Sequence, residues 1–139
     1  MVLGKVRISK QKVNYFRSLA RETRLEIQAY LVGRIVSPEL VVVDDIKYTK
    51  KYHTQRGNEV AWYKNDYEAM RSAVESNGSK VLGDIHSHSE WDAVLSPQDY
   101  KVGITEGFRL HGLCSTQGRK TRVRFWVVES ALPLDIEYV

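Results

Sequence analysis

Hydrophobic and polar residues alternate in several short segments of the chain, and in other segments the apolar residues recur every three to four positions. Alternation is typical of a strand with one buried side, and the longer repeat is typical of a helix with one apolar face. We expect strands at residues 5–8, 26–36, 40–48, 59–63, 81–88, 111–115 and 121–129. We expect helices that are capped by Ser9 and by Asn65 or Asp66, and a third helix that opens at Ser96-Pro97. Strands and helices alternate early and a hairpin closes the chain, which predicts an α/β fold with a mixed sheet.

Two strands carry an expectation about burial. The apolar run at the start of the segment 40–48 predicts a strand that is buried on both faces. The segment 26–36 alternates, with Ile27, Ala29 and Leu31 on one face. The other face of this strand carries Glu26, Gln28 and Tyr30.

The composition is that of an ordinary globular protein, with 139 residues, 42% hydrophobic and 27% charged. This length fits one domain and no repeat or linker divides it, so we treat residues 1–139 as a single domain. The one cysteine, Cys114, excludes an internal disulfide and lacks the partner pattern of a cysteine protease. No apolar run approaches the ~20 residues of a membrane helix, and the N-terminus has no apolar signal core, so we expect a cytoplasmic protein.

Basic residues slightly outnumber acidic ones, 21 against 17, for a net charge of +4. Small basic clusters occur at 47–56 and at 119–124. Solvated loops and a hairpin explain these clusters, and a site for a polyanion is the alternative.

The segment from Gly83 to Asp99 carries the most specific chemistry. His86 and His88 are two residues apart on a predicted strand, so both imidazoles can point to one metal ion. Asp99 arrives from the first turn of the following helix and can supply a third ligand from another direction. Three protein ligands and a water form an open zinc site of the catalytic type.

The second half of this pattern has another explanation. Ser96 at a helix N-cap, proline at the first helical position and the acid Asp99 at the third make a good helix start without any metal. The complete pattern, H-x-H-x7-S-x-x-D, has a chance occurrence on the order of 5 × 10⁻⁴ for this composition. That rarity favours the metal site.

The pattern resembles the signature of the JAMM (MPN-plus, or JAB-domain) zinc metalloproteases, in which a glutamate precedes His-x-His and Ser-x-x-Asp. The positions that match one by one are His86, His88, Ser96 and Asp99. The upstream glutamate of the family is matched best by Glu26, in LEIQAYLVG, and the alternative Glu22 falls inside the first predicted helix. The chain departs from the pattern at Ser89, where the family usually has a proline.

The resemblance implies a minimal prokaryotic or phage-type member with a mixed sheet flanked by helices, layered as in cytidine deaminases. It implies one Zn²⁺ per chain, held by His86, His88 and Asp99. Glu26 would be the general acid and base that acts on the zinc-bound water, and Ser96 would donate a hydrogen bond to the oxyanion unless it is committed to the helix cap. The implied activity is that of a deubiquitinase-like isopeptidase or peptidase.

The implied substrate is an amide bond that follows the extended C-terminal tail of a ubiquitin-like or sulfur-carrier protein, bound by addition to a sheet edge. Nothing in the sequence chooses among such partners, and neither nucleic acid nor a membrane is expected as one.

Three other polar residues have several interpretations. Asp84 shares a strand face with both motif histidines, so it can accept a hydrogen bond from a ring N–H or can face water. His53 and His111 have no motif context and are interpreted as surface or strand residues.

Two functions compete with hydrolysis. A DNA-associated domain similar to RadC has a related motif, but here Ser87 stands in place of asparagine and Ser89-Glu90 in place of Pro-Ser. A non-catalytic interaction module of the same fold usually lacks one or more ligands, whereas this chain keeps all of them. A zinc deaminase is set aside because the P-C-x-x-C element of that class is missing from a chain with one cysteine.

Overall fold

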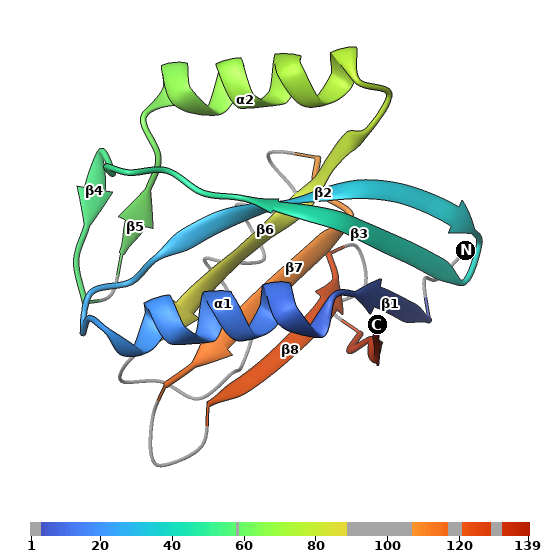
Figure 1. Ribbon diagram of the computed structural model, residues 1–139, viewed down its shortest axis with the longest axis horizontal. Coiled ribbons are helices and arrows are strands. Elements are labelled where there is room, and N and C mark those ends of the chain that lie inside the picture. Colours follow the sequence, from blue (N-terminus) through green and yellow to red (C-terminus); the bar gives the residue numbers. More distant parts are fainter. Residues whose placement is uncertain (1–3, 58, 89–106, 117–120, 129–131) are drawn as a thin grey trace.

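A mixed β-sheet forms the body of the protein (Figure 1). The computed structural model describes residues 4–57, 59–88, 107–116, 121–128 and 132–139. The strands of the sheet are β1 (Lys5–Ile8), β2 (Gln28–Ser37), β3 (Leu40–Lys47), β6 (Lys80–His88), β7 (Leu110–Ser115), β8 (Arg122–Val127) and β9 (Asp135–Tyr138). Their order across the sheet is β8-β7-β6-β2-β3-β1-β9. Strand β6 is antiparallel to β2 and parallel to β7, so the α/β class and the mixed sheet are confirmed.

Helix α1 (Lys10–Arg21) starts where the sequence predicts. The Oγ of Ser9 accepts a hydrogen bond from the N–H of Lys12 at 3.2 Å, as an N-cap should. The helix buries Val13, Phe16 and Ala20 against the sheet. No helix among the described residues is long and apolar enough to cross a membrane.

Helix α2 (Lys64–Ser76) starts earlier than expected. Its N-cap is Tyr63, in an extended conformation and without a side-chain cap bond, so the expected caps Asn65 and Asp66 are wrong and lie in the first turn. Before this helix, the short strands β4 (Thr54–Gln55) and β5 (Val60–Ala61) pair with each other as a separate ribbon. The predicted helix at Ser96 lies outside the described residues.

The strand register separates the two faces of the sheet. Ala29 lies beside Ile85 and Ile85 beside Gly112, and these residues belong to the apolar face that α1 covers. The opposite face carries Tyr30, which packs against Trp62 and, from α2, Tyr67. Each helix therefore covers one face, and polar side chains can gather on the α2 side.

Strand β3 differs from its predicted burial on both faces. Val41 and Val43 are buried with Phe16 of α1, whereas Leu40 and Val42 are only half-buried. The reason is that α1 packs on only one side of this strand. Strand β9 was not predicted from the sequence; it pairs in parallel with β1.

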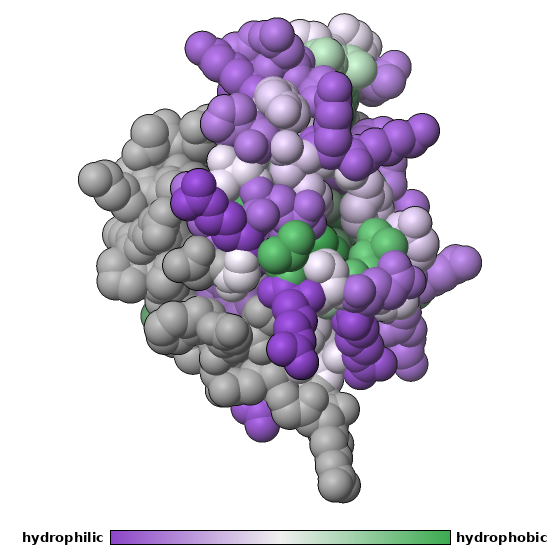
Figure 2. Space-filling view, turned by 90° about the vertical axis from the view of Figure 1, so that its left-hand side faces the viewer, coloured by the Kyte–Doolittle hydropathy of each residue, from purple (hydrophilic) through white to green (hydrophobic). Residues whose placement is uncertain are grey.

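The outer surface beside β4 and β5 is largely hydrophilic. Figure 2 shows this side of the molecule, with a small apolar patch near its middle and charged or polar side chains around it. The apolar side chains that pack on the two faces of the sheet are thus mostly kept away from water on this side.

Gly83 permits the close approach of β6 to β7. A Cβ atom built on Gly83 would lie 1.6 Å from the carbonyl oxygen of Leu110, which is backbone and cannot move aside without breaking the strand pairing. Gly83 is therefore required for the pairing next to Asp84.

We predict that Gly83→Ala lowers the free energy of unfolding by roughly 3 kcal/mol or more, because overpacking against backbone shifts a whole strand. Denaturant unfolding followed by circular dichroism measures the change. Gly57→Ala is the matched control, since its Cβ would meet only the Arg24 oxygen at 3.9 Å. Equal stability of the two variants would contradict this account of the β6–β7 contact.

Candidate metal centre

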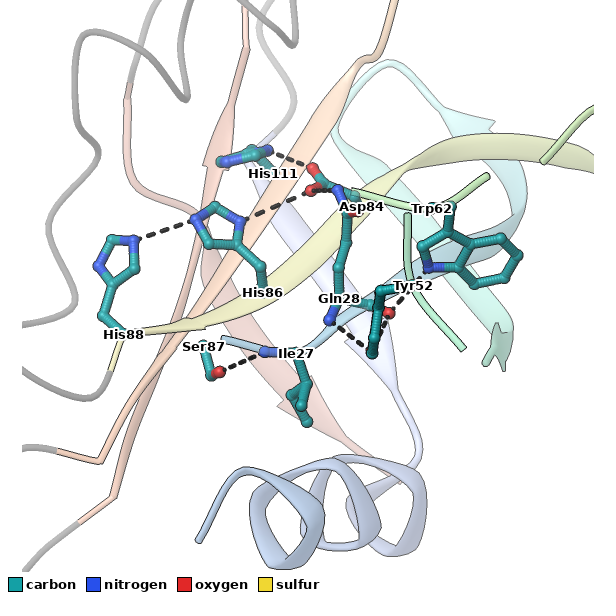
Figure 3. Close-up of polar contacts among 9 residues, drawn as sticks. All are labelled: Ile27, Gln28, Tyr52, Trp62, Asp84, His86, Ser87, His88 and His111. Carbon is teal, nitrogen blue, oxygen red and sulfur yellow. Dashed lines mark hydrogen bonds and ion pairs between the residues drawn. The ribbon is translucent and has the colours of Figure 1, made fainter. Parts of the chain in front are cut away.

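Two buried histidines meet at the end of β6. His86 and His88 point to the same side of the strand, and their Nε2 atoms lie 3.0 Å apart (Figure 3). Two ligand atoms that each lie about 2.0–2.1 Å from a tetrahedral zinc ion are separated by roughly 3.3 Å. The observed pair is close to this separation, so these two imidazoles fit a zinc ion.

Glu26 lies beside this pair. It is buried just before β2, and the ligand atoms of Glu26, His86 and His88 all lie within 4.8 Å of one another. The N–H of Glu26 donates to the carbonyl of Arg56 at 2.7 Å, which fixes the backbone there. Glu22 is instead an exposed residue at the C-cap of α1. Of the two candidate glutamates, the structure thus brings Glu26 to the histidines.

Ser87, the residue between the histidines, points to the opposite side of β6, toward α1 (Figure 3). Its Oγ accepts a hydrogen bond from the N–H of Ile27 at 2.9 Å, and its own N–H donates to the Ile27 carbonyl at 3.0 Å. These two bonds tie the segment that contains Glu26 to the end of β6. They explain how a residue outside the strand reaches the site.

Asp84 is buried on the face of β6 that carries His86 and His88. The interpretation in which Asp84 faces water is therefore wrong. Its Oδ2 accepts a hydrogen bond from Nε2 of Gln28 at 2.8 Å and lies 3.5 Å from Nδ1 of His86. Its Oδ1 lies 2.5 Å from Nδ1 of His111. Asp84 is therefore surrounded by hydrogen-bond donors and imidazoles.

His111 is the functional candidate that sequence reasoning missed. It is a strand residue, as one of the interpretations had it, but it is only 1% exposed and its β7 position lies directly beside Asp84. A histidine between Leu110 and Gly112 in an apolar segment was the available signal. It became meaningful only with the parallel register of β6 and β7. His53, in contrast, is exposed.

The charges of this cluster compensate one another. Burial by itself would raise the pKa of Asp84, but the charge and hydrogen bond of His111, and then those of His86, hold the pKa of that carboxyl far below its ordinary value. Asp84 is thus a carboxylate that accepts hydrogen bonds on the interior face of the sheet.

Asp84, His86 and His111 also have ligand atoms within 4.8 Å of one another. A shared ion would hold the Asp84 oxygen and the His111 nitrogen roughly 3.3 Å apart, whereas they are 2.5 Å apart. This shorter distance is that of a direct ion pair with no ion between the two atoms. The donors whose separation fits a shared ion are the Nε2 atoms of His86 and His88, and Glu26 lies beside them.

Two predicted site residues, Ser96 and Asp99, lie outside the described residues. Cys114 is a buried core residue, as predicted, and burial raises the pKa of its thiol to about 12. A protonated, buried thiol cannot serve as a nucleophile near neutral pH.

Comparisons with known proteins give a fold. Neither the protein-family models nor the curated proteins include a match to this chain. Among solved structures, the protein DSY2949 from Desulfitobacterium hafniense superposes with a TM-score of 0.73, at 16% identity, over 96% of this chain and 92% of that one. AF2198 from Archaeoglobus fulgidus, described as a JAB1/MPN domain protein, superposes with a TM-score of 0.61, at 17% identity, over 96% and 98% of the two chains.

These similarities extend along nearly the whole chain. The protein therefore has a JAB/MPN-like fold, as the sequence motif implied, with buried residues that could bind a metal ion. At these identities the likeness concerns the fold.

We predict that Ser87→Ala lowers the free energy of unfolding by about 1–3 kcal/mol, because the buried N–H of Ile27 loses the Oγ acceptor. Urea unfolding of the metal-free protein measures this difference. The control is Ser18→Ala, which removes an exposed hydroxyl from α1 and should change stability by less than about 0.5 kcal/mol. If both substitutions have the same small effect, Ser87 does not hold Ile27 in place.

Proposed function

We propose that the protein is a zinc-dependent hydrolase of amide bonds, an isopeptidase or peptidase of the JAMM type. One observation carries the proposal: two imidazole Nε2 atoms and the carboxylate of Glu26 converge in a buried site of a JAB/MPN-like fold. His86 and His88 would hold the ion, and the motif assigns Asp99 as the third ligand.

Each residue then has a chemical task. Zinc, when bound, lowers the pKa of a coordinated water toward ~7 and polarises the scissile carbonyl. Glu26 takes the proton of the attacking water and returns it to the leaving amine. The carboxylate of Glu26 is buried beside the two histidines, where it would be available to the attacking water once the ion is held. The motif assigns Ser96 as the hydrogen-bond donor to the developing oxyanion.

The substrate in this proposal is a protein with an extended C-terminal tail, of the ubiquitin-like or sulfur-carrier class. Support comes from the sequence motif, and such a tail would bind extended along a sheet edge. The bond cleaved is the amide that follows the tail.

We predict that Glu26→Gln keeps zinc with an affinity within about threefold of the wild type and loses hydrolysis by about 10²–10⁴-fold. The amide side chain retains the shape of Glu26 but cannot accept the proton of the water. The assay uses ubiquitin-like and sulfur-carrier proteins with a fluorophore joined by an amide bond to the terminal glycine, and zinc is measured in parallel.

The matched control is Glu22→Gln, which changes the same functional group at an exposed position. Its activity should equal that of the wild type. Activity of the Glu26→Gln variant at the wild-type level would contradict the role of Glu26 in proton transfer.

A further inference from the structure

We propose that Asp84 and His111 form a positioning pair that fixes the ring orientation and the tautomer of His86. This inference rests on the proposed function only in taking zinc as the ion that His86 binds. His111 lies outside the sequence motif, so the inference extends the site to a second strand, β7.

A row of buried contacts leads from His111 through Asp84 and His86 to His88. His111 Nδ1 lies 2.5 Å from Oδ1 of Asp84, and the other oxygen, Oδ2, lies 3.5 Å from Nδ1 of His86. The opposite ring atom of His86, Nε2, faces His88 (Figure 3). The carboxylate thus lies behind His86, on the side away from the candidate ligand position.

This geometry selects one tautomer of His86. A lone pair on Nδ1 would face a carboxylate oxygen and would be repelled, whereas a proton on Nδ1 is attracted to it. The proton therefore belongs on Nδ1, and Nε2 keeps its lone pair toward His88. That is the form of imidazole that binds a metal ion, and a carboxylate behind it raises its basicity.

His111 is needed to keep the Asp84 carboxylate in one orientation, with Oδ1 toward His111 and Oδ2 toward His86. A buried carboxylate requires donors around it, and without His111 the Oδ1 atom would have to turn toward another donor. The His111 ring also packs against the His86 ring, with centroids 5.1 Å apart. His111 therefore holds the carboxylate so that Oδ2 stays directed at His86.

The other side of Asp84 is fixed by Gln28, whose amide nitrogen donates to Oδ2 at 2.8 Å. The backbone of Gln28 is itself anchored: Tyr52 accepts from its N–H at 3.0 Å, and Trp62 donates to its carbonyl at 3.0 Å. The carboxylate is thus held between a fixed amide and a buried imidazole. It has little freedom to rotate.

The test uses His111→Phe, which keeps a ring but removes the donor, and Asp84→Asn, which keeps the shape but removes the charge. His111→Gln supplies a new N–H and should restore the effect in part. His53→Phe makes the same change of residue type at an exposed site whose ring contacts Tyr63. All four are compared with the wild type by circular dichroism before measurement.

Two readouts are recorded on each folded variant. The ¹⁵N chemical shifts of the imidazoles in the metal-free protein report the tautomer of His86. Zinc affinity is measured by competition with a chelator. We expect Nδ1–H in the wild type, a mixed or inverted tautomer in His111→Phe and Asp84→Asn, and a zinc affinity that falls about 10–100-fold in both. His111→Gln should lie within about fivefold of the wild type, and His53→Phe should equal it.

The proposal is overturned if wild-type His86 carries its proton on Nε2, or if both tautomer and zinc affinity survive in Asp84→Asn or in folded His111→Phe. If His111→Phe does not fold, Asp84→Asn decides alone. The tautomer is measured without metal or substrate, so a failure of hydrolysis leaves this result intact. Conversely, loss of the positioning effect leaves the role of Glu26 unaffected.

Discussion

Strand β6 is hydrogen-bonded to β2 on one side and to β7 on the other, and this double pairing places the buried polar groups around Asp84 and His86. Its register sets His86 beside Gln28 and Asp84 beside His111. A shift of one residue on either side would turn those partners to the opposite face, against α1. The close backbone contact at Gly83, next to Asp84, protects this register.

The ionisable groups of the cluster lie beside groups that partly compensate their burial. Three imidazoles and two carboxylates on one face of a sheet would be costly if each stood alone, because buried charges need partners. Here Asp84 serves Gln28, His86 and His111 at once, while His86 and His88 face each other on the far side. The apolar residues lie on the face that α1 covers. Because the apolar and polar side chains lie on opposite faces of the sheet, the polar cluster does not interrupt the packing of the hydrophobic core.

The sequence predicted what depends on short-range pattern. Strands β1, β2, β3, β5 and β6, the Ser9 cap and the alignment of His86 with His88 all follow from local periodicity, whereas β4 lies in a polar segment with no such pattern. The role of His111 did not, because it depends on a parallel pairing between strands separated by more than twenty residues. Strand β3 was predicted to be buried on both faces for a similar reason. An apolar run does not show whether helices cover both faces of a strand or only one. Glu26 was found by motif spacing, and its approach to the histidines depends on the distant Ser87 contact.

We propose that one ion binds between His86 and His88, on the side of His86 away from Asp84. Anomalous diffraction at the zinc edge, from crystals grown with zinc, locates such an ion. We expect a single strong peak within bonding distance, about 2.0–2.1 Å, of both Nε2 atoms. A peak between Asp84 and His111, or no peak at the two Nε2 atoms in zinc-saturated crystals, would contradict it.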